Sequence, residues 1–144
     1  MSILVCSACA VHKHTINQGI SGDVRWVEGN LMPALGDTTY LDRSKGIPVA
    51  REIYIFKAIK IHDVKPQIGD FYSDIKSELI KRVKTDKNGK FTVMLPPGKY
   101  SVFVMEKEGF FANKYDGEGY INPVIVVAGE FAEMNITINY KAYY

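Results

Sequence analysis

The sequence predicts an all-β chain, a seven-stranded β-sandwich with a short helical turn near residues 73–78. Three observations predict it: short runs that alternate between apolar and polar residues, their interruption by glycine and proline, and the scarcity of helical periodicity after Gly19. The chain has 144 residues, the size of one ordinary domain with a sizeable core. We therefore expect a single sandwich domain over 19–144, preceded by a separate leading segment over 1–18.

The first two predicted strands differ in how much of their surface is buried. In the run that begins at Gly19, Ile20, Val24 and Trp26 share one face while polar residues take the other, which predicts one dry face with Trp26 in the core. The run 51–61 has apolar residues on both faces, with Ile53, Ile55, Ile59 and Ile61 on one and Tyr54, Phe56 and Ala58 on the other. This second strand is expected to be covered on both sides and central in its sheet.

Five further strands follow, rich in β-branched and aromatic residues, at 79–85, 90–95, 99–107, 122–127 and 132–140. The helical turn before them is predicted because Ile75, Leu79 and Val83 are spaced four apart. Between the first two strands, Glu28 to Pro48 shows no sustained period and predicts a long irregular connection. Such a connection is either a functional loop or a floppy insertion.

Two turns have clear chemistry. Asp86 is expected to bond the backbone two residues on, with Asn88 and Gly89 accepting positive φ, so that the chain reverses between strands. In LPPGKY, Pro97 and Gly98 predict a type II turn, after which the Tyr100 ring enters the core and its hydroxyl bonds back to the nearby backbone.

The string TDKNGKFTVMLPPGKYSVFV, Thr85 to Val104, resembles the carboxypeptidase regulatory-like domain, a transthyretin-like sandwich. The likeness extends to ISGDV near the start, to GIPVAREIYIF and to EGFF, and covers about two-thirds of the body. It implies a transthyretin-like, Greek-key order of the seven strands. It also implies a non-catalytic accessory module of exported and surface proteins of bacteria. The segments 28–48 and 62–80 depart from the family pattern.

Composition excludes several classes of function. Eighteen basic and sixteen acidic residues give a net charge of +2 without a charged block, so we expect no nucleic acid partner. His62 is the single histidine after residue 14, and both cysteines lie in the first nine residues. Related sandwich enzymes need several histidines, so no catalytic residue, metal site or cofactor is predicted. His62 is expected at the surface near a strand end.

The candidate binding surface is the glycine-rich segment Gly109 to Pro123, and its proposed ligand-contacting residues are Phe111, Tyr115, Asp116 and Tyr120. Loop aromatics give a large contact area at low entropic cost, which suits a glycan, a peptide or a partner protein. In the other interpretation, Phe110 and Phe111 close the end of the sandwich. Asp116 and Glu118 supply too few oxygens for a calcium loop, and turn formation explains Asp116 as well.

The opening residues MSILVCSACAVHKH allow three interpretations: a zinc site of Cys6, Cys9, His12 and His14, a redox dithiol, or the end of an export signal. The four donors lie too close together for a structural zinc site, and an all-β body lacks the βαβ context of a redox motif. SILVCSAC resembles a bacterial lipobox, with Cys9 as the acylated residue, although the basic region of a signal is missing. Met1 is then an internal start or the remnant of a trimmed signal.

Two hypotheses for function follow. The first is a lipid-anchored, non-catalytic module of the bacterial cell envelope, on the periplasmic or outer surface, that binds a glycan, a peptide or a partner protein. The second is a hydrolase-type enzyme with an unrecognised site in the loops 28–48 and 109–123. Convergence of acidic residues from both loops on one cleft favours the enzyme, and an aromatic surface favours the binding module.

Overall fold

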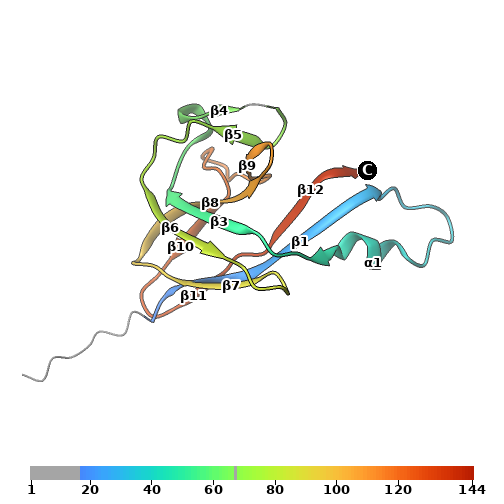
Figure 1. The fold of residues 1–144 in the computed structure, drawn as a ribbon, viewed down its shortest axis with the longest axis horizontal. Coiled ribbons are helices and arrows are strands. Elements are labelled where there is room, and N and C mark those ends of the chain that lie inside the picture. The colour runs from blue at the N-terminus through green and yellow to red at the C-terminus, as the bar shows by residue number, and fades with distance from the viewer. Residues whose placement is uncertain (1–16, 67) are drawn as a thin grey trace, which may run out of the picture.

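The computed structural model describes residues 17–66 and 68–144 and shows an all-β, sandwich-like fold of two sheets with one short helix (Figure 1). The leading residues Cys6, Cys9, His12 and His14 lie outside the described residues. The strands are β1 (Gly19–Asn30), β2 (Ile47–Pro48), β3 (Glu52–Lys57), β4 (Lys65–Pro66), β5 (Phe71–Ser73), β6 (Leu79–Lys84), β7 (Lys90–Met94), β8 (Gly98–Glu106), β9 (Gly109–Phe111), β10 (Pro123–Val126), β11 (Phe131–Glu133) and β12 (Ile136–Tyr143). The helix α1 spans Tyr40–Lys45, and a 3-10 turn, η1, spans Ile61–Asp63.

Seven of these described strands have four or more residues, and each overlaps one of the seven runs that the sequence predicts: β1, β3, β6, β7, β8, β10 and β12. The last predicted run, 132–140, is divided in the structure, because its start belongs to β11 and β12 continues to Tyr143. The other five are pieces of two or three residues that extend the sheet edges. Alternation therefore located the long strands, whereas the short pieces are too brief to produce a period.

β1 is the central strand of the five-stranded sheet, and the other four strands all pair with it. Its first part pairs with β7 on one side and β11 on the other, and its second part pairs with β2 and β12. A bulge between Trp26 and Glu28 shifts the register of β1, and Val27 at this point is buried. Ile20 and Val24 are fully buried, and Trp26 is half-buried against the core, which confirms the dry face predicted for this strand.

The seven-stranded sheet has the order β4-β5-β9-β8-β3-β6, with β10 paired to the start of β8. β3 lies between β6 and β8, so it is an interior strand of its sheet, as predicted. Both of its faces are also covered. Ile53 and Ile55 face the main core between the sheets, while Phe56 faces a second cluster on the other side of the sheet. Ile59 belongs to that second cluster and not to the face of Ile53, because the strand ends at Lys57.

The helical turn predicted near 73–78 is wrong. β5 ends at Ser73, Asp74 adopts a left-handed conformation with φ of 53°, and 75–78 contains no helix. A left-handed residue directly after a strand breaks the α-helical path. The spacing of Ile75 and Val83 does not mark one face either, since Ile75 packs on the second cluster and Val83 on the main core.

The connection 28–48 is more ordered than the sequence predicts. β1 continues to Asn30, and α1 and β2 occupy much of the remainder, so the chain leaves and rejoins the same sheet. Arg43 secures this excursion through Asp37 and the carbonyl of Asn30. Figure 1 shows α1 and the C terminus at one end of the long axis, opposite the start of β1. No helix of residues 17–66 and 68–144 has the length and apolarity to span a bilayer.

The two turns predicted from their chemistry form, with differences in detail. Asp86 Oδ1 accepts the backbone N–H groups of Asn88 and Lys90 at 2.8 and 2.9 Å, and Gly89 alone of the predicted pair has positive φ. This turn carries the chain from one sheet to the other and does not join paired strands, because β6 pairs with β3 and β7 with β1.

The turn before β8 also differs in type from the prediction. Gly98 has a φ of 159°, which is outside the range of a type II corner, and β8 begins at that residue. Tyr100 behaves as predicted: its ring is buried in the main core and its hydroxyl donates to the carbonyl of Pro96.

Candidate functional site

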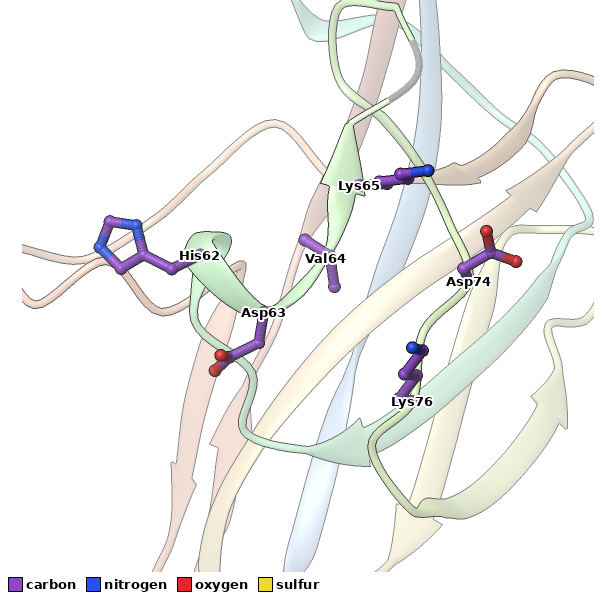
Figure 2. A pocket seen from close by; sticks show the side chains of 6 residues that line it. All are labelled: His62, Asp63, Val64, Lys65, Asp74 and Lys76. Atoms are coloured by element: carbon purple, nitrogen blue, oxygen red, sulfur yellow. The ribbon is translucent and has the colours of Figure 1, made fainter.

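Three surface pockets in the described part of the chain bear on a binding or catalytic site. The first, which we call the His62 pocket, has a volume of about 300 Å³ and is lined by His62, Asp63, Val64, Lys65, Asp74 and Lys76. Figure 2 shows that its side chains diverge, with the His62 ring pointing away from the other five. His62 is exposed in η1, so it is the surface residue that the sequence predicts. A divergent set of this kind does not form a convergent constellation for catalysis.

The second pocket, the Tyr115 pocket, lies beside the candidate binding segment. Its volume is about 320 Å³, and its polar and aromatic lining includes Lys114, Tyr115, Asp116, Asn122, Glu133 and Asn135. The lining comes from two places in the sequence, the loop between β9 and β10 and the link from β11 to β12. The pocket therefore exists only because the fold brings these segments together.

The loop between β9 and β10 is fixed by backbone hydrogen bonds at both sides. The N–H of Asn122 donates to the carbonyl of Lys114 at 2.7 Å, and Tyr115 pairs with Ile121 in an isolated bridge. At the tip, Asp116 closes a tight turn, since its Oδ1 accepts the N–H groups of Glu118 and Tyr120 at 3.0 and 2.9 Å. The loop is therefore held by hydrogen bonds within the chain.

A lysine clamps the outside of the same turn. Lys99 Nζ lies 2.9 Å from Asp116 Oδ2 and 3.6 Å from the ring centroid of Tyr120, and Lys60 Nζ lies 5.1 Å from that ring. The hydrogen bond between Lys99 and Asp116 is the main reason that the pKa of Lys99 is raised and the pKa of Asp116 is lowered. Both side chains stay partly exposed, so this contact orders the loop more than it stabilises the fold.

The four residues proposed as ligand contacts have different surroundings. Tyr115 is 60% exposed and lines its pocket, while Phe111 is fully buried in the main core. Of the two phenylalanines that the other interpretation places at the end of the sandwich, Phe111 thus lies in the main core, and Phe110 packs against the second cluster. The ring of Tyr120 is covered by Lys99 and Lys60. Both carboxylate oxygens of Asp116 already accept hydrogen bonds, Oδ1 within the turn and Oδ2 from Lys99. Tyr115 is the one of the four whose side chain is open to a ligand.

Asn122 of the predicted segment was not singled out from the sequence, and Glu133, Met134 and Asn135 of this pocket lie outside that segment. Asn122 is buried with a φ of 37°, and its side chain donates to the carbonyl of Val102 at 2.8 Å. Asn135 donates to Glu133 at 2.7 Å, and both line the pocket wall. In MNITINY, Asn135 alternates with the apolar residues Ile136 and Ile138, which indicates an outward side chain, but nothing in the sequence indicates which loop it faces.

The third pocket, the β1 pocket, lies on the outer face of the five-stranded sheet and has a volume of about 520 Å³. Its lining includes Ser21, Asp23, Lys90, Thr92 and Phe131. Glu133 and Asn135 line it too, so the β1 pocket and the Tyr115 pocket share a wall. No residue of 28–48 lines any of the three pockets, so the two segments of the enzyme hypothesis do not meet in them.

Comparison with known proteins adds no assignment. No family model, no curated protein and no solved structure matches this chain. Among residues 17–66 and 68–144, no three His, Cys, Asp or Glu side chains gather as a metal site. The geometry of the pockets is therefore the basis for an argument about function.

Proposed function

We propose that this chain is a non-catalytic binding module of the bacterial cell envelope, and that its ligand contacts the Tyr115 pocket. The observation that carries this proposal is an exposed aromatic ring on a loop that is already fixed. Tyr115 is 60% exposed beside polar groups, and backbone bonds hold the loop on either side of it. A glycan, a peptide or a partner protein can use such a surface.

The rigidity of the loop is what makes the exposed ring significant. Ordering a flexible segment on binding costs free energy, and a segment that is ordered beforehand avoids that cost. Here the turn of Asp116, the Lys99 contact and the bond from Asn122 to Lys114 supply the order. Aromatic side chains held in this way are typical anchors of binding surfaces.

The local structure of the string that carries the resemblance supports the proposed relation to transthyretin-like, carboxypeptidase regulatory-like domains. The string from Thr85 to Val104 forms a turn, β7, a bend and β8, with the Tyr100 hydroxyl bonded to the backbone of Pro96. We carry over from that family only the expectation of a Greek-key order and an accessory, non-catalytic role. Fold resemblance alone does not assign a ligand.

The proposed location, a lipid anchor in the cell envelope, rests on the lipobox-like string SILVCSAC, with Cys9 as the site of acylation. A lipid chain stabilises membrane attachment by about 0.8 kcal/mol per buried methylene group. Expression in a bacterial host with a labelled palmitate analogue tests this. Cys9→Ser is expected to abolish labelling and release the protein from the membrane fraction, while Cys6→Ser leaves both unchanged. Equal labelling of the Cys9→Ser variant contradicts the proposed anchor.

Binding itself is tested by co-sedimentation of the purified chain with insoluble bacterial envelope fragments. Tyr115→Ala is expected to reduce the bound fraction by about tenfold, the loss of one aromatic anchor. Tyr143→Ala is the matched control, because Tyr143 is 64% exposed and lies on β12 outside the three pockets. Equal effects of the two substitutions, or no effect of either, contradict a role for the Tyr115 pocket.

A further inference from the structure

The β1 pocket is a groove whose floor is made of small residues. In register along the sheet, Ser21 of β1 lies between Thr92 of β7 and Glu133 of β11. Gly22, the next residue of β1, also lines the pocket. These two small residues on the central strand lie between longer side chains on its neighbours, among them Lys90, Phe131 and Glu133, and this difference in size leaves a trough along β1.

The far end of this groove is polar. Asp23 is paired with Lys90 in the register, accepts Arg25 at 3.2 Å, and its backbone N–H donates to Asn135 Oδ1 at 3.2 Å. Asn135 in turn holds Glu133, so the wall between the two pockets is an ordered amide and carboxylate pair. Hydroxyl, amide, ammonium and carboxylate groups thus follow one another along the trough, with both donors and acceptors present.

The backbone N–H and C=O groups of β1 at the floor of the groove are already paired within the sheet. Ser21 pairs with Thr92 on one side and with Glu133 on the other, so the hydrogen bonds of β1 are used within the sheet at this point. A peptide that binds by strand addition needs an unpaired edge. Recognition in this groove therefore has to use side chains. The carboxylates of Asp23 and Glu133 also disfavour an anionic ligand such as a nucleic acid.

Each pocket contains one exposed aromatic ring together with polar groups. Phe131 is 40% exposed in the β1 pocket, and Tyr115 is exposed in the neighbouring pocket. A pyranose ring has an apolar C–H face and a rim of hydroxyl groups that donate and accept. An aromatic surface fits the first, and side chains such as Ser, Thr, Asn and Glu fit the second.

We propose that the β1 pocket and the Tyr115 pocket form one binding site for a neutral oligosaccharide, which crosses the shared wall of Glu133 and Asn135. The proposal rests on the proposed function, since it names the ligand of the same binding surface. Two aromatic rings in separate pockets mean that the ligand has more than one sugar ring. Binding is therefore expected to strengthen with chain length until both pockets are filled.

The probes are neutral oligosaccharides from disaccharides to hexasaccharides, built from glucose, mannose, galactose or N-acetylglucosamine. Titration calorimetry of the full chain is expected to show at least one series in which the longest members bind about tenfold more tightly than the disaccharide. Backbone amide shifts in NMR are expected to change at Ser21, Asp23, Glu133 and Lys114 in the same titration. Absence of binding in every series overturns the proposal.

A variant that fills the groove provides the sharper test. Ser21→Tyr places a large ring on the floor of the trough, at an outward position of a strand that tolerates aromatic residues. It is expected to weaken the longest ligand about tenfold. Thr137→Tyr is the control, because Thr137 pairs with Arg25 on the same sheet and faces outward outside the pockets. Circular dichroism of both variants checks that they fold, and the NMR footprint on the native chain needs no variant.

The outcomes separate this inference from the proposed function. If Tyr115→Ala lowers co-sedimentation with envelope fragments but no oligosaccharide competes, the glycan site is overturned and the binding module stands. If an oligosaccharide binds and Ser21→Tyr has no effect on it, the joined site is overturned. If the native chain binds neither fragments nor oligosaccharides, both proposals fail. Length-dependent binding that Ser21→Tyr weakens and Thr137→Tyr preserves supports the joined site.

Discussion

Two turns of this molecule, 86–90 and 116–120, have the same local construction and different surroundings. In each, an aspartate oxygen accepts the backbone N–H groups two and four residues on. In each, the glycine three residues after the aspartate has a positive φ, 72° in the first and 87° in the second. The shared pattern Asp-x-x-Gly therefore accompanies the same turn in two different surroundings.

The surroundings decide what each turn contributes. Gly89 lies against β1, and a Cβ there would come within 2.3 Å of the carbonyl oxygen of Val24. The nearest atom to a Cβ at Gly119 is a side-chain carbon of Ile61 at 3.8 Å, so that turn stands clear of backbone. The first turn joins the sheets and belongs to the core structure. The second is held by Lys99 and presents a loop at the surface, which is why we propose the binding surface there.

The largest difference is expected when each glycine is replaced by alanine. Gly89→Ala combines an unfavourable positive φ with a backbone clash and is expected to lower the free energy of unfolding by about 3 kcal/mol. Gly119→Ala meets only the conformational cost, about 1 kcal/mol. Urea denaturation of the two variants measures both values. Equal losses would contradict the view that the two turns differ in packing.

A second comparison sets the Lys99 contact against the ion pair of Arg51 and Glu106. Glu106 is almost buried and accepts both Arg51 Nε at 2.8 Å and the hydroxyl of Tyr140 at 3.0 Å. Burial, with the bond to Glu106, raises the pKa of Tyr140 to about 12. Glu106→Gln is expected to cost about 2 kcal/mol of stability, reduced from the fully buried case because Arg51 is partly exposed.

Urea denaturation of Glu106→Gln is compared with that of Asp116→Asn. The Asp116→Asn substitution is expected to change the free energy of unfolding much less, because the ion pair of Asp116 is solvated. A larger loss from Asp116→Asn would show that the loop turn carries global stability.

The native chain is also expected to lose stability between pH 10 and 12. The pKa of Tyr140 is higher in the folded state than in the unfolded state, so its contribution to stability is fully present below the pKa of the unfolded state. That contribution is lost as the pH rises through the pKa of the folded state.

The aspartates themselves provide a third comparison. Asp86→Ala is expected to lower the free energy of unfolding by about 1 kcal/mol, because the turn that connects the sheets loses two hydrogen bonds. Asp116→Ala is expected to act locally, with faster hydrogen exchange at the amides of Glu118 and Tyr120 and little change elsewhere. Amide exchange measured by NMR distinguishes the two. Slow exchange at both amides in the Asp116→Ala variant contradicts the local role.

The smallest expected effect is a pH dependence confined to the loop. The pKa of Asp116 lies below its ordinary 3.8, so its contribution is present above that pH and is lost as the pH falls through the folded value. The pKa of Lys99 lies above 10.5, so its contribution is present below that pH and is lost as the pH rises through the folded value. The amide shift of Gly119 is expected to report both transitions. Lys99→Met should remove the alkaline one, and its persistence in that variant argues against the clamp.

The predicted fold is accurate where the evidence is local. Alternation over five to nine residues located the seven longer strands, since a sheet with one buried face imposes that period directly. It failed at 73–78, where a spacing of four suggested a helix. The positive φ of Asp74 and the packing of Ile75 on the second cluster settle that segment, and neither is visible as a pattern.

The candidate site was predicted only in part. The segment 109–123 does line a pocket, but its aromatic residues have separate positions: Phe111 in the core, Tyr120 beneath Lys99 and Tyr115 at the surface. Neighbours in a loop can differ completely in burial, because burial depends on which distant strand each one meets. The partner wall, Glu133 and Asn135, comes from another part of the chain.

By itself, the sequence determined the strand pattern, the two aspartate turns and the Tyr100 contact with Pro96, because each depends on interactions over a few residues. The tertiary structure decided that β1 pairs with four other strands and that Ser21, Thr92 and Glu133 stand side by side across one sheet. Strand register joins residues that are far apart in the chain, and a pocket forms from that register and from the bulk of the facing side chains.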